Sequence, residues 1–534
     1  MASRSFKRLI VCCDGSWMNA LGKQGESSPP SNVWRICRLF RNVCENGCNQ
    51  IVYYHAGVGS SGSRLDSVTG GDFGVGLDAD IRELYSFICM NYVDGDDIIL
   101  IGFSRGAFTA RAVADMIASL GLLSHNGLDH FYEIFTDYQL MGSKSRDPQK
   151  YLFKGLQPYG DEKGTAKILW EEERKRQYRH ALNQMAYTRD TFQDGVTKIK
   201  IKAVAVWDTA LALDEPRAAF RPALWERVHD NETNLKQVWF PGSHANVGGG
   251  YYDQQIANIT LAWMCDQLMS VAVEFDMNIM KKVFLAGLQW SAAHPFPWVP
   301  SATKGQPLPW ANSDIFPSST FSTCSRDEEH DDVAVESTTD VASLWATARP
   351  WGLGQTRAPT SLLQKAMGQV TRRPGHCMRI EEDTNEPTHE PLMNTGEAIH
   401  SSVRVRLVCG GLSMDDEETW TCKPLRLSED SNQVWELERV GTADLKESLS
   451  LTAGAFNQDS ATASALPHTQ ATWQWSCPQA VARADNADAM QVNTSSGILP
   501  EEPLTGICER TLLALTAGQQ DVWKYAEDSK GATS

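Results

Sequence analysis

The sequence has no hydrophobic run long enough to cross a membrane. Near the amino end the apolar run Leu9–Cys13 covers five residues before Asp14, which is too short for the hydrophobic segment of a secretory signal. No uninterrupted apolar stretch approaches the roughly 18 residues that a transmembrane helix needs. We therefore expect a cytoplasmic protein without a transmembrane segment.

The sequence also lacks metal-binding motifs and an excess of basic residues. Its 13 cysteines are scattered, and no Cys/His set has the spacing of a zinc site, so we expect reduced thiols, no metal and no cofactor. A net charge of −17 over 534 residues argues against binding to nucleic acid or to anionic lipid through a basic surface. The net charge does not argue against a neutral substrate or against peripheral membrane contact. The sequence does not indicate the oligomeric state.

One segment has the pattern of a nucleophile elbow, the sharp turn that presents a catalytic serine. A buried-strand pattern over Ile98–Ile101 ends in Gly102-Phe103-Ser104-Arg105-Gly106, and an Ala-rich helical pattern follows. The motif G-x-S-x-G alone is weak, because a chain of this length shows it by chance roughly one time in six. Its place between a strand and a helix is the context that the elbow requires. The pattern predicts Ser104 as a nucleophile; the alternative is a serine in an ordinary Gly-rich turn.

The order of elements predicts an α/β fold with a mostly parallel sheet and helices on both faces, as in the α/β-hydrolases. Residues 1–290 form the expected core, with an insertion at 121–198 that is either a helical cap over the active site or a surface insertion. Residues 291–400 are loop-rich, with their order left open, and 401–534 form an irregular C-terminal extension with short strands and a terminal helix. The strands and helices that we expect are, in order, strands at 8–13, 51–55, 197–207, 237–240, 403–409 and 434–440, and helices at 33–42, 77–92, 256–272 and 504–526.

Further candidate site residues lie at the ends of predicted strands. In open parallel sheets, ligands bind beyond the carboxyl ends of the strands. Asp208 ends one strand, and His244 lies four residues beyond the next, which gives the chain order Ser, Asp, His of the α/β-hydrolases. The alternatives are a helix N-cap for Asp208 and a backbone-bonded loop histidine for His244. His400 is a rival base that fits the same chain order.

Glycine-rich loops supply candidates for an oxyanion hole. The backbone N–H of Arg105 and a second N–H from Asp14-Gly15-Ser16 would stabilise a developing oxyanion. Gly57 opens the segment Gly57–Gly62, which matches G-x-G-x-x-G after a strand. A dinucleotide site would need a helix that begins there. Because the sequence predicts a longer loop instead, Gly57 more simply borders a substrate pocket.

Five ordered motifs, together with Ile399–Val403, resemble one family: the uncharacterised α/β-hydrolase domain shared by fungal proteins and by phospholipase effectors of bacterial type VI secretion. The resemblance implies esterase or phospholipase chemistry and supports Ser104, Asp208 and a histidine as a triad. Two positions depart from the family pattern, with Asn246 in place of Asp and Ser16 in place of Thr. The motifs are Asp14-Gly15-Ser16-Trp17, Gly57-Val58-Gly59, Gly102-Phe103-Ser104-Arg105-Gly106-Ala107, Val206-Trp207-Asp208-Thr209 and Phe240-Pro241-Gly242-Ser243-His244 with Gly248-Gly249-Gly250-Tyr251.

The leading hypothesis is a serine carboxylic ester hydrolase, phospholipase- or lipase-like, that works through an acyl-enzyme. The Trp-containing, irregular residues 291–400 and the change at Asn246 motivate an alternative, a non-catalytic interaction protein on a hydrolase scaffold. The acyl and head groups of the substrate stay open.

Overall fold

The computed structural model describes two compact units, and each is considered by itself. Unit 1 comprises Met1–Asp208, Gln267–Asp276 and Ile380–Thr388; unit 2 comprises Thr209–Asp266, Met277–Arg379 and His389–Ser534. Within them the described residues are 6–16, 18, 29–57, 72–143, 146–158, 160, 162, 165–207, 211–227, 231–294, 344, 348–358, 368–380, 387–426, 434–444, 469–477, 497–515, 523 and 526.

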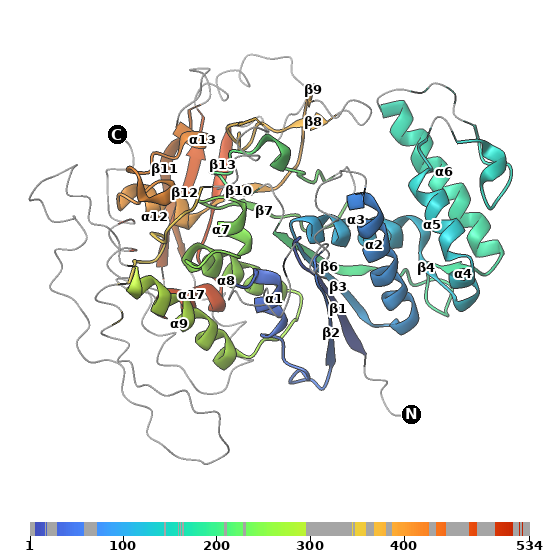
Figure 1. The fold of residues 1–534 in the computed structure, drawn as a ribbon, viewed down its shortest axis with the longest axis horizontal. Helices are drawn as coiled ribbons and strands as arrows, with labels where there is room; N and C mark the ends of the chain where they lie inside the picture. Colours follow the sequence, from blue (N-terminus) through green and yellow to red (C-terminus); the bar gives the residue numbers. More distant parts are fainter. Residues whose placement is uncertain are drawn as a thin grey trace, which may run out of the picture. The chain divides into compact units, whose positions relative to one another are not determined.

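Unit 1 contains a parallel sheet of four strands (Figure 1). Its strands are β1 (Lys7–Cys13), β2 (Asn49–His55), β3 (Asp97–Phe103) and β6 (Ile201–Trp207), in the order β2-β1-β3-β6. Every neighbouring pair is parallel. The central strands β1 and β3 are buried over almost their whole length, as strands covered on both faces must be. The predicted α/β class with a parallel sheet is confirmed.

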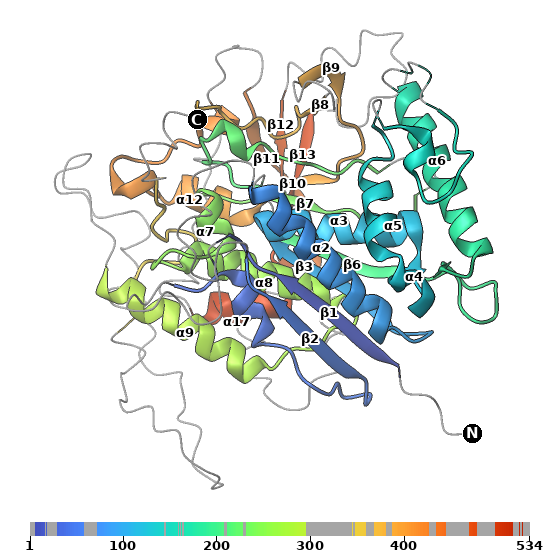
Figure 2. The ribbon, with the colours of Figure 1, turned by 45° about the vertical axis from the view of Figure 1, so that its right-hand side comes forward.

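Helices cover both faces of this sheet (Figure 2). Leu9 and Val11 of β1 belong to one apolar cluster with residues of α2 (Asp72–Asn91) and α3 (Arg105–Leu120). Cys12 points to the opposite face, because successive side chains alternate along a strand. There its thiol is hydrogen-bonded to Cys37 of α1 (Asn32–Cys37). Helix α2 begins at Asp72, five residues before the predicted start.

The insertion after α3 is helical, as expected, and shares the apolar cluster of α2 and α3. Two of its side chains form hydrogen bonds with α3. Tyr138 donates to the Asp115 carboxylate, and Arg179 donates to the carbonyl oxygen of Ala118 at 2.9 Å. Those positions lie roughly 16–21 Å along the helix from Ser104 at ~1.5 Å per residue, so the cap role stays a prediction. Its elements are β4 (Leu122–Leu123), α4 (His125–Asp129), α5 (Phe131–Gln139), η1 (Pro148–Lys150), α6 (Thr165–Gln184) and β5 (Thr188–Arg189).

Unit 2 contains a mixed sheet in the order β11-β12-β13-β10-β7. The strands are β7 (Gln237–Trp239), β10 (Glu397–His400), β11 (Glu436–Asp444), β12 (Thr469–Ser476) and β13 (Ile498–Glu502). β7, β10 and β13 are parallel, whereas β12 is antiparallel to both of its neighbours. A core rich in tryptophan, including Trp239 and Trp475, packs on this sheet. The other elements are η2 (Ala218–Phe220), α7 (His244–Gly248), α8 (Gln255–Met269), α9 (Met277–Ala293), β8 (Met378–Ile380), β9 (Pro387–Pro391), α12 (Ser401–Val408), η3 (Met414–Asp416), α13 (Lys423–Arg426) and α17 (Ile507–Leu515).

The prediction of a strand over 403–409 is wrong, because Ser401–Val408 form helix α12. The alternation of apolar residues with Arg404 and Arg406 is typical of a strand with one solvent-exposed face. Both arginines are instead fully buried. Arg404 Nε pairs with Glu501 at 2.9 Å, and Arg406 donates to the carbonyl of Gly354 at 2.9 Å. The two guanidinium groups are therefore hydrogen-bonded to buried partners from distant segments, and not to solvent as the pattern predicted.

No helix in the described part of the chain is both long enough and apolar enough to span a bilayer.

Candidate active site

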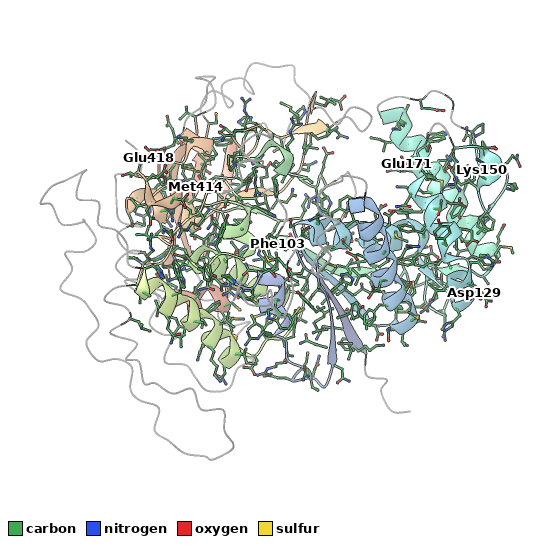
Figure 3. All side chains as sticks on the ribbon, viewed as in Figure 1. Phe103, Asp129, Lys150, Glu171, Met414 and Glu418 are labelled. Atoms are coloured by element: carbon green, nitrogen blue, oxygen red, sulfur yellow. The ribbon has the colours of Figure 1, made fainter. Side chains whose placement is uncertain are left out.

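Ser104 lies on a strained turn between β3 and α3. Its backbone angles are φ 57° and ψ −126°, a region that costs a residue with a side chain about 1–3 kcal/mol. The turn is fixed from both sides: Ser104 N donates to Trp207 O at 3.1 Å, and Ser104 O accepts from Ala107 N at 2.9 Å. Figure 3 labels the preceding residue, Phe103, at the end of β3. The predicted strand–turn–helix context of Ser104 is present.

The two glycines of the motif are required by close packing. A Cβ on Gly102 would lie 2.4 Å from Gly106 O, and one on Gly106 would lie 2.2 Å from Cys13 O and 2.5 Å from Asp14 O. All of these neighbours are main-chain atoms, which cannot rotate away. The spacing of Gly102 and Gly106 around the serine is therefore a steric requirement of the turn.

The loop after β1 lies against Ser104. A Cβ on Gly15 would lie 3.4 Å from Ser104 Cβ. The Asp14 carboxylate accepts from Gly15 N at 2.7 Å and from the Tyr54 hydroxyl at 2.7 Å, and it also takes a hydrogen bond from Ser31. Burial raises the pKa of Asp14 above its usual value, although these three hydrogen bonds oppose the shift. Asp14 therefore holds the loop in place through its side chain.

Gly57 packs against the main chain of the same loop. A Cβ there would lie 1.8 Å from Gly15 O, and Gly57 N donates to Met18 O at 3.0 Å. The structure thus brings Asp14, Gly15 and Gly57 together beside Ser104, although their contact with a substrate stays a prediction. Residues 58–62 of the glycine-rich pattern lie outside the described residues. Arg105 begins α3, and burial lowers its pKa.

His244 is the first residue of α7 in unit 2 and is 6% exposed. Its main-chain N–H donates to Glu215 Oε2 at 3.0 Å, and its ring meets Phe220 edge-on with centroids 5.1 Å apart. Burial lowers the pKa of the imidazole to about 3, an effect that Glu215 opposes and the nearby Arg217 and Arg372 reinforce. The ring is therefore neutral at pH 7, the form that can accept a proton.

Glu215 is a positioning residue that the sequence reasoning missed. It is 1% exposed, and its carboxylate accepts from Arg217 Nε at 2.6 Å and Nη2 at 2.8 Å. Burial alone would raise the pKa of Glu215, but the hydrogen bonds from Arg217 and from His244 N lower it overall. The charged run Asp214-Glu215-Pro216-Arg217 was a visible signal. Its contact with a segment 29 residues away along the chain was not.

Asn246, where the family pattern has Asp, serves as an acceptor in the helix cap. Its Oδ1 accepts from Ser243 N and Ser243 Oγ, both at 2.9 Å, and from Arg357 N at 3.3 Å. Its side chain thus fixes the start of α7 from within unit 2.

His400 is fully buried, and partners in unit 2 engage both of its ring nitrogens. Nδ1 accepts from Ser402 N at 3.1 Å and Nε2 lies 2.8 Å from Glu509 Oε1. The ring stacks on Phe240 at 4.6 Å. Burial lowers the pKa of His400 to about 4, although Glu502 and Glu501 oppose this. These contacts are those of a residue that builds the core.

The candidate residues are distributed over both units. Ser104 belongs to unit 1, whereas His244 and His400 belong to unit 2. Asp208 lies outside the described residues, so its triad role stays a prediction. Among the described residues, no group of three His, Cys, Asp or Glu side chains is placed to hold a metal ion.

Comparison with known proteins shows which family part of this chain resembles. Residues 7–210 and 209–267 match the family model described as the type VI secretion system phospholipase effector Tle1-like catalytic domain. An uncharacterized protein of Saccharomyces cerevisiae is 35% identical over 147 residues, which are 25% of this chain and 20% of that protein. This chain thus spans about a fifth of its yeast relative. The family model thus matches residues 7–267, just under half of the chain, and the resemblance to a family shared by fungal proteins and bacterial effectors is confirmed over that part.

A solved structure is also similar in part. The crystal structure of an uncharacterized protein from Pseudomonas aeruginosa matches over 51% of this chain and 47% of that chain, with 13% identity and a TM-score of 0.27. A TM-score at that level does not establish a shared fold.

The Gly106→Ala substitution should destabilise unit 1. The new Cβ would meet main-chain oxygens at 2.2 and 2.5 Å, and overpacking of this kind costs about 3 kcal/mol. Thermal unfolding measures the loss. Gly441→Ala is the control, because its Cβ would have one ordinary contact, at 3.4 Å from Thr472 Oγ1. Equal melting temperatures for the two variants would contradict the steric argument.

Acidification from pH 7.5 to 5 should destabilise the protein through His244. The pKa of its imidazole is about 3 in the folded protein and 6.5 in the unfolded chain, so the unfolded chain binds the proton more readily. The contribution of the neutral imidazole to the free energy of unfolding is fully present above pH 6.5. It is lost as the pH falls toward 3, and about 2 kcal/mol is lost by pH 5. Denaturant unfolding at both pH values should show a smaller change for His244→Gln than for wild type. An unchanged pH dependence would show that the imidazole is not buried as described.

Proposed function

We propose that this protein is a serine ester hydrolase of phospholipase or lipase type, with Ser104 as nucleophile, His244 as general base and Asp208 as the carboxylate that orients the base. The observation that carries the proposal is the backbone of Ser104, with φ 57° on a strand–turn–helix. A positive φ at a residue with a side chain persists only where the surrounding structure enforces it, and such strain gathers at functional sites. Here the strain lifts a hydroxyl away from the sheet at the start of a helix.

The chemistry follows from these groups. Neutral His244 accepts the proton of Ser104 Oγ as that oxygen attacks the ester carbonyl carbon, and the carbonyl oxygen becomes the oxyanion. The imidazolium then gives its proton to the departing alkoxide, which leaves an acyl-Ser104 ester and a free alcohol. Water attacks this ester with His244 again as base, which releases the acid and restores the serine. An α/β-hydrolase arrangement of the sheet is part of the proposal, and the parallel order β2-β1-β3-β6 supports it.

His244 is preferred to His400 as the base because of their surroundings in unit 2. His400 is 0% exposed and its two ring nitrogens are taken by Ser402 and Glu509. To act as a base it would have to give up one of these two hydrogen bonds. His244 begins α7, five residues after the end of β7, and Glu215 and Asn246 fix the main chain there.

A lipid ester is the proposed substrate class, and the phospholipase effector description of the matching family supports it. A net charge of −17 gives no long-range attraction to an anionic membrane surface. We therefore expect that apolar and neutral contacts bind the substrate, and that any membrane contact is peripheral.

The alternative of a non-catalytic scaffold rested partly on Asn246. Because that amide supplies the acceptor that the cap of α7 needs, its presence no longer argues against catalysis. Residues 291–400 fall largely outside the described residues and do not decide between the two functions.

Ser104→Ala should abolish covalent labelling by a fluorophosphonate probe. The probe reacts with an activated serine hydroxyl, and no other residue is proposed as nucleophile. Labelling is measured by gel fluorescence and peptide mapping, with Ser119→Ala on the same helix as the control. A folded wild-type protein that stays unlabelled would instead favour the scaffold function.

Substitution of the two histidines should separate catalysis from folding. His244→Gln should lower kcat for an ester hydrolysed by the wild type by about 10⁴–10⁶-fold with a small change in melting temperature at pH 7.5. His400→Gln should leave Glu509 with a broken hydrogen bond, lower stability by about 2–4 kcal/mol, and keep kcat in the folded fraction. The reverse pattern would make His400 the base.

A further inference from the structure

The loop after β1 contains a buried hydroxyl without a partner. Ser16 Oγ is inaccessible to solvent, and among the described residues no group accepts from it or donates to it. Leaving a buried polar group unsatisfied costs about 1–3 kcal/mol, and such groups in native structures call for an explanation. Ser16 lies one residue beyond Gly15, whose added Cβ would lie 3.4 Å from Ser104 Cβ.

The surrounding contacts exclude the simplest oxyanion donor in this loop. Gly15 N already donates to the Asp14 carboxylate at 2.7 Å, so this N–H is not available to a substrate. Gly15 O is occupied as well, because it accepts from Met18 N at 3.0 Å. The next group along the chain that can donate is therefore on Ser16.

The loop is also held rigidly enough to present a donor. Asp14 is fixed by Tyr54 and Ser31, and Gly57 N donates to Met18 O at 3.0 Å on the other side of the turn. A donor that is fixed before the reaction needs no reorganisation when charge develops, which is why such groups stabilise transition states strongly.

We propose that the Ser16 hydroxyl donates a hydrogen bond to the oxyanion formed at the substrate carbonyl after attack by Ser104. The inference rests on the proposed serine hydrolase function and adds a catalytic residue to it. Asp14 is then a positioning residue, because its carboxylate accepts the hydrogen bond of Gly15 N and Ser16 remains as the donor.

The test compares Ser16→Ala with Ser16→Thr in the full-length protein. Two rates are measured: kcat for a p-nitrophenyl acyl ester and the second-order rate of fluorophosphonate labelling at Ser104, whose phosphoryl oxygen occupies the same place. Ser16→Ala should lower both by about 10²–10³-fold, and Ser16→Thr should restore both to within a few-fold of wild type. The melting temperature of Ser16→Ala should stay level or rise, because the variant removes an unsatisfied hydroxyl.

Ser401→Ala is the matched control, because Ser401 Oγ is likewise buried without a partner in the described part of unit 2. It should keep both rates and the melting temperature. The inference is overturned if Ser16→Ala reacts like wild type, if Ser16→Thr is as slow as Ser16→Ala, or if Ser16→Ala unfolds. A reactive Ser104 in a fully active Ser16→Ala protein would leave the hydrolase function standing, whereas an unreactive Ser104 in the wild type would remove both.

Discussion

The structure of the candidate site depends on one steric constraint, the contact of Gly106 with the end of β1. A main-chain oxygen of Cys13 occupies the space that a side chain at position 106 would need. Because α3 starts this close to β1, the chain between β3 and α3 must turn within a single residue, and Ser104 takes up the strain in its positive φ. The same contact places the loop Asp14-Gly15-Ser16 beside the nucleophile. One packing requirement therefore sets both the exposure of the hydroxyl and the position of the groups proposed to stabilise the oxyanion.

Unit 2 positions its histidine by a different physical means, a set of buried charges. Glu215 lies between the main chain of His244 and the guanidinium of Arg217, and Arg372 donates to Arg217 O at 2.8 Å. Buried ion pairs of this kind add little net stability compared with apolar packing, but removing one partner is costly. Their effect here is to fix the start of α7 in one conformation while the imidazole stays neutral. A general base must be neutral to accept a proton, and it works best when its pKa lies near the working pH.

The parts that could be predicted from the sequence are those in which local pattern and local structure coincide. The elbow was visible because its glycines, strand and helix all lie within about twenty residues of chain. The helix at Ser401–Val408 was not, because Arg404 pairs with Glu501, 97 residues away, and a buried arginine looks like a solvent-facing one in the sequence. β12 and β13 were missed for another reason: they lie in or at the end of the polar segment 446–500, which is rich in Ala, Ser and Thr and shows no regular periodicity. The hydrogen bonds of Asp14 could not be predicted either, since Tyr54 is 40 residues from it. Local patterns therefore locate the turn that carries Ser104, whereas the groups that hold this turn in place depend on tertiary contacts.

The departure from the family pattern at Asn246 illustrates how one substitution can change charge without changing hydrogen bonding. Three donors converge on Asn246 Oδ1, two from Ser243 and one from Arg357. A carboxylate would accept all three, so the cap of α7 tolerates either residue. The difference is electrostatic. A negative charge two residues from His244 would raise the pKa of the imidazole, whereas the amide leaves burial and the two arginines to lower it. The chain thus keeps the hydrogen bonds of the cap, and the His244 imidazole is neutral at pH 7.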